Sequence, residues 1–278
     1  MGIANMQKTT LFASIYQKYY FLFYLHSLVM EKLQLFNILD SVDSTNNYAM
    51  ARLNEGMAGH GMAWFAREQT AGKGQRGKKW HSEPDNNILL SMVVKPTAAF
   101  ISNPFYLSAL VAATCNDFLQ KISGEFFFIK WPNDLFWRDR KTGGILIENK
   151  YTGNQWNWAV IGIGINVNQT MFDSDMSKAA SLKEVSGKNH YEPIALAREL
   201  HEYLLEKIDN FSENDFECIL NDYNESLYKK NSMVTLKKSN ASFSTTIVGV
   251  NPYGQLLTSD TTDRVFNFGE VQWLLPDK

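Results

Sequence analysis

Residues 71–80 read AGKGQRGKKW and combine three glycines, four cations and a terminal tryptophan in ten positions. Glycines let a backbone approach a ligand closely, the cations can neutralise phosphate, and the indole offers a face for stacking. The stretch lacks the Ser or Thr that closes a Walker-type phosphate loop, and it matches the glycine pattern of dinucleotide-binding folds only by coincidence. Two interpretations stay open, a loop that holds a nucleotide and a solvated basic hairpin.

The composition is that of a globular protein. The chain has 278 residues, of which 45% are hydrophobic, and a net charge of -2. A chain of this length can bury one large core and a smaller second one. The near-neutral charge makes the basic stretch a local feature and argues against a dedicated DNA-binding protein. The two cysteines and five histidines match no metal or redox spacing, which suits a reducing cytoplasm.

Residues 1–36 form an N-terminal extension whose role is open. Residues 11–30 are rich in Leu, Phe and Tyr, but Gln17, Lys18 and His26 interrupt them. The cleanest apolar run falls short of the roughly 20 residues that a membrane-spanning helix needs. An added amphipathic helix and sequence upstream of a start at Met30 are favoured over a membrane-facing segment. Nothing here resembles a helix-turn-helix, so we expect no regulatory DNA-binding domain, no DNA partner and no membrane partner.

From residue 37 the chain alternates short apolar strands with helices. Strands are predicted over 37–41, 62–68, 87–95, 126–130, 144–148 and 158–166, and helices over 48–53, 105–122, 193–210 and 215–228. After residue 232 the pattern changes to four short strands, over 234–237, 243–250, 255–259 and 265–268. The sequence therefore predicts an α+β domain over residues 37–229 and a small β-barrel over residues 230–278.

Three further motifs indicate a ligand site. Residues 130–134 read KWPND and place a lysine at a strand end, where its amine can bind a carboxylate or a phosphate. A surface lysine followed by an ordinary turn is the alternative. Residues 143–148 read GGILIE and residues 162–166 read GIGIN. Glycines inside a strand indicate that something lies flat against the sheet, either a ligand ring or closely packed protein.

The four motifs, in this order and at these separations, resemble the catalytic domain of the biotin protein ligase (biotin acetyl-CoA-carboxylase ligase) family. Residues 249–258, GVNPYGQLLT, resemble part of that family's SH3-like domain. The resemblance covers residues 37–278. It implies a class II synthetase-like catalytic domain with a mixed sheet and flanking helices, followed by a C-terminal SH3-like domain. It also implies the monofunctional type, without an N-terminal DNA-binding domain.

By the same resemblance, the chain is an ATP-dependent ligase, a biotin–[acetyl-CoA-carboxylase] ligase. Such an enzyme activates biotin as biotinyl-5'-AMP and transfers it to one lysine of a biotin carboxyl carrier protein or of a carrier domain in a carboxylase. ATP and biotin are the substrates, and Mg²⁺ is expected with ATP, with no ligands assigned. The family includes monomers and dimers, so a homodimer stays open.

The resemblance also assigns residues to roles. Lys130 is the catalytic residue, because a cation must lie between the biotin carboxylate and the ATP phosphates. Biotin binding falls to Ser44, Thr45, Gln69, Gly72, Lys73, Lys130, Gly144, Gly162 and Gly164. ATP and adenylate binding falls to Gln75, Arg76, Lys78, Trp80, Lys141 and Asn166. Trp80 would stack on the adenine and Asn166 would hydrogen-bond it.

Two positions of residues 71–80 depart from the family pattern. Lys73 stands where an arginine is usual, and Gln75 stands where a second arginine is frequent, so we expect Gln75 to hold the adenylate less tightly.

Two alternative functions remain. A lipoate protein ligase shares the fold but not these motifs, and a catalytically silent binding module would be expected to have lost Lys130 or the loop cations.

Overall fold

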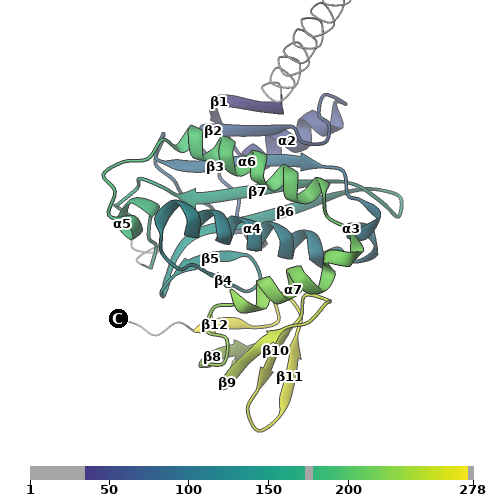
Figure 1. Ribbon diagram of the computed structural model, residues 1–278, viewed down its shortest axis with the longest axis vertical. Coiled ribbons are helices and arrows are strands. Elements are labelled where there is room, and N and C mark those ends of the chain that lie inside the picture. Colours follow the sequence, from purple (N-terminus) through teal and green to yellow (C-terminus); the bar gives the residue numbers. More distant parts are fainter. Residues whose placement is uncertain (1–34, 173–177, 275–278) are drawn as a thin grey trace, which may run out of the picture.

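A computed structural model describes residues 35–172 and 178–274. Figure 1 shows a large sheet with helices lying across it and a smaller sheet at one end of the molecule. Residues 1–34 of the predicted N-terminal extension lie outside the described ranges, and so do the expectations for them. No helix within those ranges is long and apolar enough to cross a membrane.

The larger sheet has seven strands. They are β1 (Phe36–Val42), β2 (Ala63–Gln69), β3 (Asn87–Val94), β4 (Phe128–Lys130), β5 (Asp134–Trp137), β6 (Arg140–Thr152) and β7 (Gln155–Asn166). Their order across the sheet is β1-β2-β3-β7-β6-β5-β4. The β1 and β2 strands pair in parallel, and the other neighbours pair antiparallel. The predicted mixed sheet is therefore confirmed.

Helices cover both faces of this sheet. On one face lie α4 (Phe105–Ser123) and α6 (Pro193–Asp209), and α2 (Thr45–Asn54) lies on the other (Figure 1). Successive strand residues point to opposite faces, so Leu90 and Met92 of β3 enter the core under α4 and α6. Val93, which follows Met92 and points to the opposite face, packs with Ala49 and Leu53 of α2. The α2 face carries the candidate site.

The smaller sheet is antiparallel. Its strands are β8 (Met233–Lys238), β9 (Ala241–Val250), β10 (Leu256–Ser259), β11 (Asp263–Phe266) and β12 (Gln272–Leu274), in the order β11-β10-β9-β8-β12. It is consistent with a small β domain, and the boundary at residues 229 and 230 stays a prediction. The hydrogen bonds that join it to the rest of the molecule include those from Trp131 Nε1 to the Gly254 carbonyl at 2.9 Å and from Asn224 Nδ2 to the Val250 carbonyl at 3.0 Å.

Several elements differ from the sequence-based prediction. The sequence did not predict β5, β12, α3 (Ala98–Ser102) or α5 (Leu182–Ser186). Each is at most five residues long, too short for a periodic pattern to emerge. Asp134, interpreted as a turn residue, begins β5 and pairs with Lys130. The last helix, α7 (Phe216–Glu225), is shorter than the predicted 215–228.

Candidate active site

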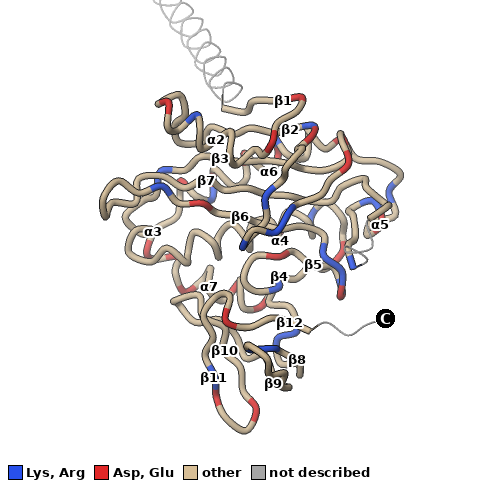
Figure 2. Tube along the Cα trace, turned by 180° about the vertical axis from the view of Figure 1, so that it is seen from behind, with Lys and Arg blue, Asp and Glu red and all other residues tan. Residues whose placement is uncertain are grey.

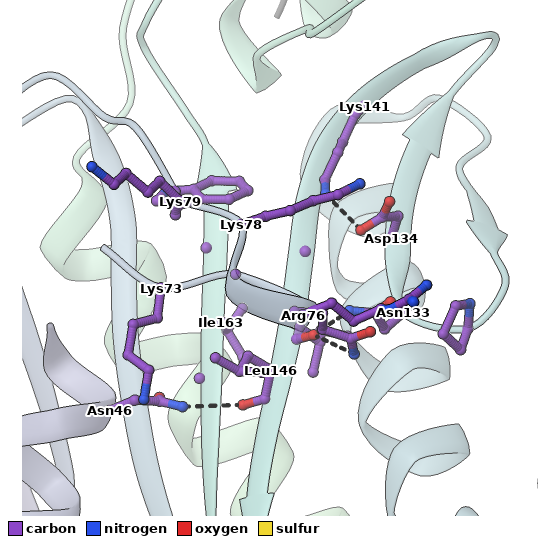
Figure 3. Close-up of a pocket in the computed structure, with 18 of the residues that line it drawn as sticks. Asn46, Lys73, Arg76, Lys78, Lys79, Asn133, Asp134, Lys141, Leu146 and Ile163 are labelled. Atoms are coloured by element: carbon purple, nitrogen blue, oxygen red, sulfur yellow. Dashed lines mark hydrogen bonds and ion pairs between the residues drawn. The ribbon is translucent and has the colours of Figure 1, made fainter. Parts of the chain in front are cut away.

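A cavity of about 440 Å³ lies on the α2 face of the large sheet and reaches the small sheet. Its volume is in the range of small-molecule sites. Residues 71–80, called the glycine loop below, cross one side, and the start of β12 with the loop before it closes another. Figure 3 shows four cations of the glycine loop, Lys73, Arg76, Lys78 and Lys79, around the cavity. The predicted site residues that line it are Ser44, Thr45, Gln69, Lys73, Gln75, Arg76, Lys78, Trp80, Lys130, Lys141, Gly144, Gly162 and Gly164.

The glycine loop is a hairpin folded against the sheet. The Trp80 amide donates to the Gly72 carbonyl at 2.9 Å, and the Gly74 amide donates to the Lys78 carbonyl at 2.7 Å. Arg76 and Gly77, at the tip, have φ angles of 55° and 76°. A Cβ on Gly72 would lie 2.5 Å from the Trp80 carbonyl oxygen. Gly72 therefore serves the close approach of the two hairpin strands, and the structure does not bring it into the cavity.

Two loop cations are tied to other elements. Lys73 Nζ pairs with Glu148 Oε1 at 2.7 Å and donates to Asn47 Oδ1 at 3.1 Å. The Arg76 guanidinium donates to the Gly269 carbonyl, in the small sheet's last loop, at 3.2 Å. Figure 2 shows the molecule from the side opposite to Figure 1, and on this side Lys and Arg positions lie across the middle of the molecule. The loop therefore brings positive charge to the cavity and bridges it to the C-terminal sheet.

The two glycines in β7 make room for protein side chains. A Cβ on Gly162 would lie 2.2 Å from Asn46 Oδ1, and one on Gly164 would lie 2.6 Å from Trp80 Cε2. Of the two interpretations, close packing therefore describes these positions, although both glycines still line the cavity. The structure does not bring Asn166 into the cavity. Its side chain is buried and donates to the Ala180 carbonyl at 3.1 Å.

A group of buried and partly buried polar side chains lies along one wall of the cavity and directly behind it. Gln69 Oε1 accepts hydrogen bonds from the Thr45 amide at 2.8 Å and the Thr45 hydroxyl at 3.0 Å. Ser91 Oγ donates to Asn46 Oδ1 at 2.6 Å and lies 2.7 Å from Thr45 Oγ1. Ser44 is buried beside them. Such fixed polar groups favour a ligand that returns their hydrogen bonds and disfavour one that cannot.

Lys130 extends from the end of β4, where the chain turns through Trp131 and a cis Pro132 into β5. The side chain is half-buried. Burial lowers the pKa of Lys130 from its usual range. The charge of Asp134 opposes this change in pKa, and those of Lys141 and Lys78 add to it. The lysine can therefore meet an anion in the cavity with little water between them.

Asp134 is the one carboxylate on the cavity wall among the described residues. Its Oδ1 pairs with Lys141 Nζ at 2.6 Å, and Figure 3 shows this pair beside Lys78. The Asn133 side chain donates to the Ile145 carbonyl and fixes the turn against β6. Within the described ranges, no three His, Cys, Asp or Glu side chains gather as a metal site.

Sequence reasoning did not single out several residues of the site. They are Asn46, Ser91, Glu148, Phe136 and Trp273. Asn46 follows Ser44 and Thr45 directly, so its place at the start of α2 was a usable signal. Trp273 comes from the small sheet, and nothing local to it indicates that it lines this cavity.

A family model described as the Biotin/lipoate A/B protein ligase family matches residues 38–166. The bifunctional ligase/repressor BirA of Escherichia coli is 38% identical over 138 residues, 48% of this chain and 40% of that protein. The biotin–[acetyl-CoA-carboxylase] ligase of Paracoccus denitrificans is 35% identical over 47% of this chain and 53% of its own length. The matches thus span about half the length of these curated relatives or less.

Among solved structures, the biotin protein ligase of Aquifex aeolicus in complex with biotin and ATP superposes with a TM-score of 0.72. It is 25% identical, and the match covers 86% of this chain and 98% of that one. The similarity therefore extends over both sheets, beyond the range of the family model. Residues 38–166 of this chain thus match the Biotin/lipoate A/B protein ligase family model, and the fold as a whole is similar to that of a biotin protein ligase.

Proposed function

We propose that this protein is an ATP-dependent biotin ligase. It activates biotin as biotinyl-5'-AMP and transfers the biotinyl group to one lysine of a biotin carboxyl carrier protein or domain. The observation that carries the proposal is the position of Lys130. It shares one cavity with the glycine loop and with the polar group around Thr45 and Gln69. The relatives' names, and the biotin and ATP bound in the Aquifex aeolicus enzyme, support the same reaction.

In the first half-reaction, a biotin carboxylate oxygen attacks the α-phosphorus of ATP. A bond from that oxygen to phosphorus forms, the bond to the β-phosphate bridging oxygen breaks, and pyrophosphate leaves. Two anions must approach each other in this step, so a cation between them stabilises the transition state more than the separated reactants. Lys130 takes this role, and burial strengthens the interaction by excluding water.

In the second half-reaction, the amine of the acceptor lysine attacks the acyl carbon of biotinyl-5'-AMP. An amide bond forms, AMP leaves with the electrons of the broken acyl–oxygen bond, and the amine proton passes to solvent. The cavity opens to the surface beside the exposed Lys78 and Lys79 of the glycine loop. An acceptor side chain can therefore reach the acyl carbon from outside.

The binding roles follow the cavity's chemistry. The polar group of Thr45 and Gln69 suits the ureido ring of biotin. Trp80 provides a stacking face for the adenine, and Arg76 and Lys78 provide charge for the phosphates. Lys73, Lys141, Gln75 and Gly144 line the same space, and Ser44 lies next to the polar group.

Magnesium is expected to enter with the nucleotide. In nucleotide sites this ion is usually held by one or two carboxylates together with substrate phosphates. Asp134, the carboxylate on the wall, fits that pattern. When bound, the ion would neutralise phosphate charge during pyrophosphate departure. The compartment we propose is the cytoplasm, which suits two cysteines that are not paired.

Biotinyl-AMP formation tests the proposal directly. Purified protein is incubated with biotin and α-labelled ATP, and the adenylate is separated and counted. We expect biotin-dependent adenylate, none with lipoate, and transfer to a carrier domain. Adenylate with lipoate alone would favour a lipoate ligase, and none with either ligand would favour a silent binding module.

The Lys130→Ala variant should lose adenylate formation while keeping its thermal unfolding transition. Lys121→Ala is the matched control, because that surface lysine pairs with Asp117 on α4, away from the cavity. Normal turnover in Lys130→Ala would exclude the assigned role of Lys130.

A further inference from the structure

The Lys130 ammonium lies among aromatic rings that come from both sheets. Its Nζ is 5.2 Å from the ring centroid of Phe136, in β5, and 5.6 Å from that of Trp273, in β12. A cation within about 6 Å of a ring centroid is attracted by the ring's negative face. Within the part of the chain that the structure describes, Lys130 Nζ makes no hydrogen bond or ion pair. The two rings therefore contact the ammonium directly.

A third ring joins the two. The Tyr228 ring centroid lies 5.1 Å from that of Phe136 and 5.8 Å from that of Trp273. Its hydroxyl donates to Asp139 Oδ1 at 2.5 Å, and Lys229 Nζ pairs with the same oxygen at 2.8 Å. We call Phe136, Tyr228 and Trp273 the aromatic box. Both Phe136 and Tyr228 are buried, so the box is part of the packed interface between the sheets.

The position of Trp273 is set by strand pairing and not by a loop. In β12 it pairs with Leu236 of β8, a fully buried residue of the small sheet. On its other side it lines the cavity, together with Lys130. The small sheet thus holds one ring in a fixed place above a lysine of the large sheet.

Most of the electrostatic surroundings of Lys130 disfavour its charged form, which the Trp273 ring can stabilise. The charged groups that act on Lys130 are Asp134, which favours the ammonium, and Lys141 and Lys78, which disfavour it. Asp134 is itself paired with Lys141. Asp139, the carboxylate bound to the aromatic box, is held by Tyr228 and Lys229. Burial disfavours the ammonium further. An uncharged aromatic ring that attracts a cation therefore stabilises the charged form of Lys130 against burial and against the two neighbouring lysines.

We propose that Trp273 is a positioning residue for Lys130, holding the ammonium through its ring face at the place where carboxylate and α-phosphate must meet. This inference rests on the proposed function. The ring orients the lysine and adds attraction for its charged form, without adding a group that could itself titrate or pair with the phosphates. The small β domain would in this way contribute directly to the activation half-reaction.

Two substitutions distinguish the effect of the aromatic face of Trp273 from the effect of its apolar bulk. Trp273→Leu keeps an apolar side chain in place but removes the aromatic face, whereas Trp273→Phe retains a face. We expect the Leu variant to form biotinyl-AMP roughly three- to thirtyfold more slowly at saturating ATP and biotin. The KM values for both substrates should stay close to those of the parent. The Phe variant should recover most of the rate.

The protonation of Lys130 gives a readout that a purely structural role would not move. Nuclear magnetic resonance of lysines labelled with ¹³C at Cε follows the titration, and the Lys130→Arg variant assigns the signal. We expect the pKa of Lys130 to be lower in Trp273→Leu than in Trp273→Phe, because the ring favours the ammonium while both side chains keep water out. The Lys130 Cε protons should also lose the part of their ring-current shift that comes from Trp273, whereas the part from Phe136 should remain.

Phe243→Leu is the matched control. Phe243 packs on Phe266 within the small sheet, with ring centroids 5.9 Å apart, and does not line the cavity. It should lower thermal stability without changing the rate or the Lys130 titration. Equal rates and equal Lys130 titrations in the Leu and Phe variants of Trp273 would overturn the inference. So would a rate loss in Phe243→Leu as large as that in Trp273→Leu.

The experiment also distinguishes this inference from the proposed function. If the parent protein forms no biotinyl-AMP, the proposed function fails, whatever the Trp273 variants do. If the parent is active, only the comparison of the variants decides about Trp273. Should Trp273→Leu fail to fold, the difference in the ring-current shift of the Lys130 Cε protons between the parent and Trp273→Phe still decides it, because Phe136 is the same in both proteins. An identical shift in the two would overturn the inference.

Discussion

The contact between Trp80 and Gly164 predicts that one added methyl group will impair nucleotide binding. In Gly164→Ala the new Cβ would lie 2.6 Å from Trp80 Cε2 and 2.8 Å from Cζ2. Ordinary contact begins at 3.4 Å, so the indole must withdraw by about 0.8 Å, the difference between 3.4 and 2.6 Å. The backbone at Gly164 is not in the left-handed region, so alanine adds no backbone strain there.

The size of the effect follows from what the indole loses. Stacking between a base and an aromatic side chain contributes about 1–3 kcal/mol. Each 1.4 kcal/mol is a factor of ten, so losing the stacked position should raise the KM for ATP roughly five- to hundredfold. The free energy of unfolding should change much less. Trp80 is partly exposed at the end of the hairpin, and its ring can shift toward solvent, so we expect a loss below about 1 kcal/mol.

Initial rates of biotinyl-AMP formation at varied ATP, with biotin saturating, measure this KM. The matched control is Gly59→Ala, where a Cβ meets nothing within 4 Å. An unchanged KM for ATP in Gly164→Ala, relative to this control, would refute the assignment of Trp80 to the adenine. A rise in the KM for biotin alone would instead indicate that the biotin ring lies on Gly164.

Two further predictions concern single side chains. Gln75→Arg should slow the release of biotinyl-AMP, because a guanidinium adds charge and a planar donor pair where the side-chain amide of Gln75 now donates to the Ile145 carbonyl at 3.5 Å. Filter binding of labelled adenylate measures the release, and an unchanged rate would contradict this role of Gln75. A thiol reagent should modify only Cys218 in the native protein, since Cys115 is buried and burial raises its pKa; equal labelling of both thiols before unfolding, measured by mass spectrometry, would contradict this.

Local sequence was sufficient where an element is long or chemically distinctive. The 105–122 prediction found α4 because its apolar spacing repeats over several turns, and the structure ends that helix at Ser123. The glycine loop and KWPND were recognisable because glycines clustered with cations, and a lysine at a strand end, have a chemistry that suits an anionic ligand. These two segments supply much of the cavity wall, so most of the predicted residues do line it.

The glycines of β7 show what local sequence leaves undecided. Two glycines on one face of a strand indicate that something lies close to the sheet, and a ligand ring or a protein side chain would produce the same pattern. The structure places Asn46 and Trp80 there. Asn166 shows the same limit, because from the sequence its side-chain amide could bind a ligand in the cavity or a group of the protein itself. Its hydrogen bond to the Ala180 carbonyl depends on a segment fourteen residues further along the chain.

The aromatic box depends on contacts that no local pattern could reveal. Strand β12 has three residues, too few for an alternation to be recognised, and its place is fixed by pairing with β8. Only after the two sheets pack does Trp273 meet Lys130, which lies at the end of another short strand. The lysine could be predicted because its chemistry is visible in the sequence, whereas its surroundings are a property of the packed interface. A site built in this way ties the charge of its central cation to the docking of the small sheet, so a substitution in that interface can alter catalysis without touching a ligand.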